Sequence, residues 1–279
     1  MSNLKPLEVG SMFWADSGPL AILRNLKQMG FRSGQLGIGP DYLLLGAAPL
    51  WRHAMAAEDF ALVTVFGAYA GEDYADIPTV ERTVGFIPER TRAEREKRTI
   101  EMSDFAAAIG VKSIACHIGF VPHDQGDPRY VAVREMVRRI CDHAAKHGQS
   151  FVLETGQEPA ETLKAFFMDV GRPNLGINFD PANMILYGTG DPIEALGVLA
   201  RHVISVHAKD GDWPPADKPG ALGTERPLGQ GAVGMERFVA KLKEIGYTGT
   251  LNIEREGQSP EQWRNDQTMG RELLTRLIG

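Results

Sequence analysis

The sequence has few cysteines and no long apolar stretch, and these absences exclude several classes of protein. Only Cys116 and Cys141 occur in 279 residues, so neither a disulfide framework nor a Cys-x-x-Cys site can form. No apolar run approaches the roughly 20 residues that a membrane-spanning helix needs. The first residues, MSNLKPLEVGS, lack the basic and apolar regions of a signal peptide. We therefore expect a cytoplasmic protein that has no membrane partner.

An excess of positive charge is also missing. The chain has 30 Lys and Arg against 36 Asp and Glu, which gives a net charge of -6. Because an acidic surface repels phosphate groups, a nucleic-acid partner is not expected. Residues of the hydrophobic set make up 43% of the chain, enough for the core of one large α/β domain over 1–279.

Short apolar runs alternate with helical patterns along the whole chain. The helical pattern is clear where apolar residues recur at i, i+3, i+4 and i+7, as in Leu163, Phe166, Phe167 and Val170. Capping residues predict helix starts at Thr91-Arg-Ala-Glu94, Glu158-Pro-Ala-Glu161, Asp191-Pro-Ile-Glu194 and Ser259-Pro-Glu-Gln262. The strand candidates lie near 9–14, 33–39, 61–67, 113–119, 150–156, 175–181, 203–209 and 249–255. Eight strands alternating with helices predict a (β/α)8 TIM barrel.

Two longer segments, roughly 69–90 and 211–232, follow predicted strands and are rich in Gly, Pro and charge. Loops of this length on a barrel are typical of substrate lids. The second contains Gly229-Gln-Gly-Ala-Val-Gly234, which fits Gly-x-Gly-x-x-Gly. A dinucleotide site is not expected there, because the preceding segment reads as a loop and not as a strand. The charged run 89–98 carries both signs and is typical of a solvated helix start.

Four metal-ligating side chains, Glu154, Asp180, His207 and Glu254, stand near the C-terminal ends of successive predicted strands. Side chains on a strand alternate between two faces, and in each run the apolar residues next to these four share the opposite face. The four therefore face one mouth of the barrel. Three carboxylates and one imidazole would repel and desolvate each other without a divalent cation, so the pattern predicts one metal site.

At these residues the chain resembles the sugar phosphate isomerase/epimerase superfamily, the xylose isomerase-like TIM barrels. The resemblance rests on VLETGQE, NFDPANM, VHAKDGD and LNIERE, with Leu228-Gly-Gln-Gly231 and Gly246-Tyr-Thr-Gly249, and covers about 110–256 firmly. It implies that Glu154, Asp180, His207 and Glu254 bind one divalent ion per chain, manganese foremost and magnesium or cobalt as alternatives. It also implies that Glu154 and Glu254 are the catalytic acid and base.

This chemistry suits a metal-dependent sugar isomerase or epimerase. Removing a proton next to a sugar carbonyl creates an enediolate, and a metal that chelates the carbonyl and a neighbouring hydroxyl stabilises its negative oxygen. Two carboxylates from facing strands can reach the substrate from two sides. The expected partner is a small-molecule sugar or keto-sugar, and a homo-oligomer is compatible with the sequence. Phosphorylated sugars are not favoured, since no glycine-rich phosphate cradle follows the last strands.

Several residues around the four ligands are candidate substrate contacts. His117 lies on the fourth strand with inward parity and either contacts substrate or caps the mouth, whereas Cys116 points the other way into the core. The resembled ketohexose 3-epimerases often carry a histidine where this chain has Asn183, which puts that reaction in doubt. The remaining candidates lie just past the metal strands or in the second loop: Gln157, Glu158, Lys209, Asp210, Trp213 and Arg226.

Three alternatives stay open beside the isomerase. A lyase or dehydratase acting on a keto-sugar or keto-glycoside would use the same residues, because loss of a leaving group can follow the same proton abstraction. A non-catalytic sugar-binding or partner-binding barrel subunit is the alternative of another class. An endonuclease IV-like enzyme is disfavoured, because it would need several metals and a phosphate-binding surface, and only seven histidines are present.

Overall fold

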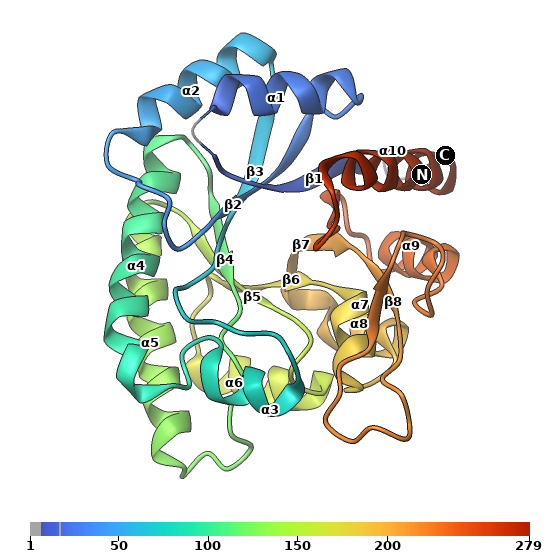
Figure 1. Cartoon of the computed structure of the whole chain (residues 1–279). Helices are drawn as coiled ribbons and strands as arrows, with labels where there is room; N and C mark the ends of the chain where they lie inside the picture. The colour runs from blue at the N-terminus through green and yellow to red at the C-terminus, as the bar shows by residue number, and fades with distance from the viewer. Residues whose placement is uncertain (1–6, 17) are drawn as a thin grey trace.

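Eight parallel strands close into a barrel with the helices in an outer ring (Figure 1). The computed structural model describes residues 7–16 and 18–279. Around the barrel the order is β1-β10-β7-β6-β5-β4-β3-β2, which confirms the predicted TIM barrel. The strands are β1 Glu8–Trp14, β2 Ser33–Ile38, β3 Ala61–Gly67, β4 Ser113–Cys116, β5 Ser150–Glu154, β6 Leu175–Phe179, β7 Val203–Ala208 and β10 Thr250–Ile253. Strands β4, β5, β6 and β10 end two or three residues earlier than predicted.

The helices cover the outer face of the barrel, where their apolar residues meet those of the strands. Residues Leu163, Phe166, Phe167 and Val170 are buried in this layer, as their spacing predicts. The helices are α1 Pro19–Gln28, α2 Ala47–Glu58, α3 Ile77–Thr83, α4 Glu89–Ala108, α5 Pro128–Ala145, α6 Ala160–Val170, α7 Pro181–Tyr187, α8 Pro192–Leu199, α9 Met235–Glu244 and α10 Pro260–Ile278, with a 3-10 turn η1 at Ala200–His202. Among the described residues, no helix combines the length and apolar character needed to cross a bilayer.

The predicted helix starts are right at two places and wrong at two. Asp191 caps α8 and accepts hydrogen bonds from the amides of Ile193 and Glu194, and Ser259 caps α10. Helix α6 instead begins at Ala160, with Pro159 at the capping position. Helix α4 begins at Glu89, so Thr91 lies inside its first turn. In both cases an extended proline ends the preceding segment and fixes the start without a side-chain cap.

The two long segments, 69–90 and 211–232, meet at one end of the barrel, and we call the pair the arch. The first contains α3, and the second contains a two-stranded antiparallel sheet of β8 Asp210–Asp212 and β9 Thr224–Arg226. The Ile77 amide of α3 donates a hydrogen bond to the Gly220 carbonyl of the second segment at 2.9 Å. The prediction of a loop ahead of Gly229 is therefore wrong at β9, but β9 belongs to an antiparallel pair and makes no parallel βα unit.

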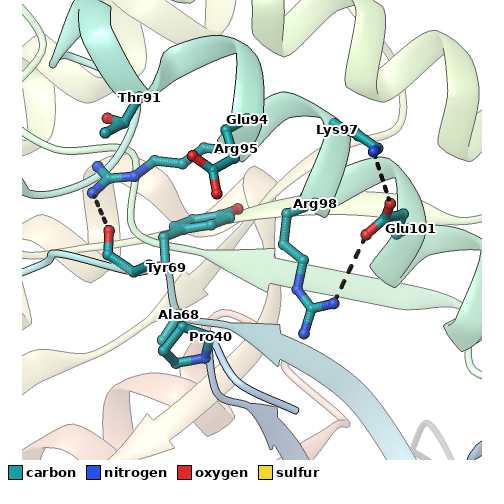
Figure 2. Close-up of a pocket in the computed structure, with 10 residues that line it drawn as sticks. Pro40, Ala68, Tyr69, Thr91, Glu94, Arg95, Lys97, Arg98 and Glu101 are labelled. Carbon is teal, nitrogen blue, oxygen red and sulfur yellow. Dashed lines mark hydrogen bonds and ion pairs between the residues drawn. The ribbon is translucent and has the colours of Figure 1, made fainter. Parts of the chain in front are cut away.

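The charged run at the start of α4 is only partly solvated, which corrects its prediction. Arg95 is 3% exposed and its guanidinium donates to the backbone carbonyls of Gly85 and Ala70. Arg98 likewise donates to the carbonyls of Gly39 and Tyr42. Figure 2 shows both arginines beside Tyr69 in a cavity of about 190 Å³. These arginines therefore tie α4 to the segments that follow β2 and β3.

Candidate metal centre and substrate cavity

The four predicted ligands converge at the carboxyl ends of β5, β6, β7 and β10. Their ligand atoms lie within 4.8 Å of one another. Around His207 Nδ1, Glu154 Oε1 lies at 2.9 Å, Glu254 Oε2 at 2.7 Å and Asp180 Oδ2 at 3.9 Å. Parallel strands bring their ends to one edge, so strand parity alone assembles this set.

Gln35 on β2 holds the imidazole of His207 through Nε2, the ring nitrogen that does not face the carboxylates. Its amide nitrogen donates to Asn178 Oδ1 at 2.9 Å and to Ser205 Oγ at 2.6 Å. The amide oxygen therefore faces His207 Nε2, 2.8 Å away, and accepts its proton. With one proton held on Nε2, Nδ1 is the nitrogen that faces the carboxylates, and it can bind a metal once it gives up its own proton.

Asp180 Oδ2 is buried and has no hydrogen-bond partner in the described part of the chain, and the buried Glu254 Oε2 faces His207 Nδ1 at 2.7 Å. Asp180 uses its other oxygen to cap α7, accepting from the amides of Ala182 and Asn183 at 2.8 and 3.0 Å. Leaving buried carboxylate oxygens unpaired is costly. Free oxygens and an imidazole nitrogen facing one point are the donor set of a divalent cation such as Mn²⁺ or Mg²⁺, so these residues fit a metal.

The charges of the cluster show the same need for a cation. Burial raises the pKa of Asp180 well above its ordinary value, against the opposing effect of Lys209. Burial would lower the pKa of His207, but the carboxylates of Glu154 and Glu254 outweigh it and raise that pKa. Burial would also raise the pKa of Glu254, but Lys209 and His207 lower it. The buried carboxylates thus draw positive charge to this point, which a divalent cation supplies.

The cluster opens into a cavity of about 320 Å³ at the carboxyl ends of the strands. Four predicted residues line it: His117, Asn183, Lys209 and Glu254. Gln157 lies beside them, with its amide nitrogen 3.2 Å from His117 Nδ1. The remaining lining comes from aromatic and acidic side chains and from the two long segments, including Trp14, Phe66, Tyr74, Tyr187, Leu222, Glu225 and Glu256.

Four other predicted contacts lie outside the lining of this cavity. Glu158 accepts from the Val121 amide at 2.7 Å and lines a separate cavity beside α6. Asp210 accepts from the amides of Gly211, Gly229, Gly231 and Val233, so it holds the second long segment in shape. Arg226 pairs with Asp212 across β8 and β9, and Trp213 is 46% exposed. Substrate contact by these four stays a prediction.

Sequence reasoning missed residues that reach the site from distant elements. Gln35 lies in a run that reads only as a strand, although its inward parity was a usable signal. Glu225 lies 3.9 Å from Lys209 Nζ and also pairs with Arg255 at 2.7 Å. Tyr74 packs near His117 with ring centroids 5.8 Å apart. Neither Tyr74 nor Glu225 follows a barrel strand directly, so no local pattern marks them.

This geometry defines a parallel (β/α)8 barrel with a candidate metal cluster at the carboxyl ends of its strands, and comparison with known sequences agrees with the barrel. The sequence profile described as Xylose isomerase-like TIM barrel matches residues 23–273. The chain belongs to the Xylose isomerase-like TIM barrel family.

Known structures repeat the same fold. A Xylose isomerase domain protein from Planctomyces limnophilus is 43% identical, with 98% of this chain and 97% of that one covered and a TM-score of 0.90. A Xylose isomerase-like TIM barrel protein from Mycobacterium smegmatis, solved in complex with magnesium, is 18% identical over 100% and 98% of the two chains, with a TM-score of 0.71. A D-allulose 3-epimerase from Methylomonas sp. is 16% identical over 99% and 100%, with a TM-score of 0.70.

Curated relatives match over a shorter stretch. Uncharacterized proteins from Methanocaldococcus jannaschii and Escherichia coli are each 28% identical to this chain over the matched stretch. The chain spans about half the length of these curated relatives, 50% and 44% respectively. The names of these two relatives state no activity.

Proposed function

We propose that this protein is a divalent-metal-dependent sugar isomerase or epimerase that moves a proton at a carbon next to a carbonyl. The observation that carries the proposal is the cluster of Glu154, Asp180, His207 and Glu254, whose carboxylate oxygens and imidazole nitrogen converge next to a 320 Å³ cavity. Cavities of this size suit small molecules. The family also contains a D-allulose 3-epimerase fold neighbour.

The four side chains of the cluster would hold the cation, with manganese foremost and magnesium or cobalt as alternatives. A magnesium complex of one fold neighbour supports a hard divalent ion. When bound, the cation supplies positive charge to the carbonyl oxygen of the substrate, where negative charge develops as the proton leaves. Gln35 would keep His207 in the ligating tautomer throughout.

Glu254 is the best-placed base of the cluster. It lines the cavity, and Lys209 Nζ lies 3.3 Å from its Oε1. Burial would raise the pKa of Glu254, but the positive charge of Lys209 lowers it, so the carboxylate is ionised and able to accept a proton. Burial would lower the pKa of Lys209, but Glu254 and Asp180 raise it, so the lysine stays charged beside the substrate.

Asn183 and His117 line the same cavity as Glu254 and would orient the hydroxyl groups of the substrate. Asn183 lies in the first turn of α7, 5% exposed, with its amide nitrogen 3.5 Å from Glu154 Oε1. Burial lowers the pKa of His117, so the imidazole is neutral and can both donate and accept hydrogen bonds. The aromatic rings of Phe66 and Trp14 offer flat apolar faces for the sugar ring.

A lyase or dehydratase on a keto-sugar or keto-glycoside is the second candidate, and two observations favour it. Glu254 lines the cavity whereas Glu154 is 2% exposed and does not, so one base reaches the substrate more readily than the other. A second cavity of about 350 Å³ shares Trp14, Glu254 and Glu256 with the first and continues along apolar residues such as Met29 and Trp263. An apolar group attached to the sugar would fit there.

Incubation of the metal-loaded protein with ketoses, aldoses and keto-glycosides in deuterated water, read by NMR, tests the proposal. An epimerase returns an isomer of equal mass with deuterium at the inverted carbon, and a lyase yields two fragments or a dehydrated sugar. Glu254→Gln should cut turnover by about 100-fold or more, since a positioned acid or base contributes that much. For an epimerase Glu154→Gln should act similarly, and Glu161→Gln, an exposed change on α6, should have no effect.

The result with the two variants separates the candidates. If only Glu254→Gln lowers proton exchange, the one-base lyase reading holds. If neither variant changes exchange or product formation, the carboxylates are not catalytic. If the wild-type protein exchanges no substrate proton with any sugar of the panel, the binding-subunit alternative replaces the enzyme.

A further inference from the structure

A second group of metal-ligating side chains lies on the outside of the barrel, where α4 and α5 end. Asp104 comes from the last turns of α4, His143 from the last turn of α5 and His147 from just beyond it. Figure 1 shows the two helices side by side. Both helices end shortly before β4 and β5 begin, so the group lies at the amino ends of the strands, opposite the substrate cavity.

The three side chains aim their ligand atoms at one point. Asp104 Oδ1 lies 2.7 Å from His143 Nε2 and 3.0 Å from His147 Nε2. The two imidazole rings are 5.4 Å apart, centre to centre. Histidines four residues apart lie on one face of a helix, which is the spacing by which helical proteins hold zinc with two imidazoles. Here the third donor comes from the neighbouring helix.

The donor set and the exposure of these residues suit a transition metal from solution. Two imidazole nitrogens and one carboxylate oxygen favour Zn²⁺, Ni²⁺ or Cu²⁺ over Mg²⁺, which prefers oxygen alone. Tetrahedral ligands about 2.1 Å from zinc are about 3.4 Å apart. The spacings of 2.7 and 3.0 Å need to open by about 0.7 and 0.4 Å. The side chains are free to do so because that of Asp104 is 56% exposed, that of His143 20% and that of His147 34%.

We propose that Asp104, His143 and His147 form a second metal site that takes one zinc-class ion and fixes the end of α4 to the end of α5. Three protein ligands leave a fourth position for water. This site shares no residue with the barrel cluster, and the proposal does not depend on the enzymatic activity. Hydrogen bonds between the same three side chains, with no metal, are the competing reading.

Zinc binding to matched variants of the full chain separates these readings. The metal-free protein is titrated with Zn²⁺ by calorimetry, and bound zinc is counted by elemental analysis. Asp180→Asn removes a ligand of the barrel cluster and weakens zinc binding there, while an amide oxygen still caps α7. The change in zinc binding on adding an outer-site substitution in this background then reports the outer site. In this background we expect one zinc per chain. Adding His147→Gln should weaken that binding at least about tenfold, whereas His53→Gln, an exposed histidine on α2, should not change it.

Spectroscopy and stability add independent readouts. Cu²⁺ bound to the Asp180→Asn protein should show electron paramagnetic resonance couplings from two nitrogens, and His147→Gln should leave one. Zinc should raise the Tm of Asp180→Asn but not of Asp180→Asn with His147→Gln. The proposal is overturned if His147→Gln leaves zinc binding unchanged or if Asp180→Asn binds no zinc. Should Asp180→Asn fail to fold, the loss of one zinc between wild type and His147→Gln makes the same test.

Discussion

Replacing Gln35 by methionine tests whether Gln35 sets the tautomer of His207, a proposed metal ligand, although Gln35 itself would not contact the metal. Methionine matches the length of glutamine, but it removes the acceptor 2.8 Å from His207 Nε2 and the donor to Asn178 and Ser205. The imidazole is then free to carry its proton on Nδ1, facing Glu154, and that proton must leave before a cation binds. Loss of such a supporting partner costs about 10- to 100-fold in metal affinity, or about 1.4 to 2.8 kcal/mol.

The assay is calorimetric titration of the metal-free protein with Mn²⁺, beside a thermal melt that reports folding. Thr64→Val is the matched control, because Thr64 belongs to the same buried layer and contacts Ser205 at 3.4 Å but not His207. We expect a weakened Kd in Gln35→Met and an unchanged Kd in Thr64→Val. If the folded Gln35→Met protein binds Mn²⁺ within twofold of wild type, the tautomer argument is wrong.

Two further predictions concern the surroundings of the site. Burial raises the pKa of Glu158 to about 8 from an ordinary 4.5. Between these pH values the folded protein keeps a proton that the unfolded chain releases. The free energy of unfolding therefore falls as the pH rises, by up to about 1.4 kcal/mol per pH unit. Glu158→Gln keeps an acceptor for the Val121 amide and should remove this dependence on pH, as read from thermal melts between pH 4.5 and 8. If the Tm of the variant and that of the wild type change with pH in parallel, the prediction is wrong. Replacing 215–221 by two glycines removes the bond from Gly220 to Ile77 and should raise KM or lower kcat with metal content unchanged; unaltered kinetics would show that the arch is not a lid.

The barrel and the convergence of four side chains at one end of it could be predicted from the sequence because both depend on local periodicity, whereas metal binding by these four stays a prediction. Strand parity places Glu154, Asp180, His207 and Glu254 on the inner face without knowledge of neighbouring strands. Closure of the barrel then brings the strand ends together. The same parity predicts that Asn178 and Ser205 point into the barrel, and there both accept hydrogen bonds from Gln35.

The rest of the site depends on the path of loops, which periodicity does not encode. Glu158 and Asp210 lie a few residues past metal strands, yet the chain turns and directs their carboxylates to backbone amides. Glu225 reaches Lys209 only because β9 pairs with β8. Arg95 is buried for a similar reason, since the carbonyls it satisfies, those of Ala70 and Gly85, belong to the long segment between β3 and α4.

Asp180 combines two roles in one carboxylate, which would couple a bound cation to the wall of the substrate cavity. One oxygen holds the first amides of α7, and the other is the unpaired oxygen that faces His207. Any force on the second oxygen is transmitted through a rigid carboxylate to the start of α7, a helix that carries Asn183 and Tyr187 into the cavity wall. Ions of different radius would therefore set the cavity to slightly different widths, and the choice of metal would change substrate preference as well as rate.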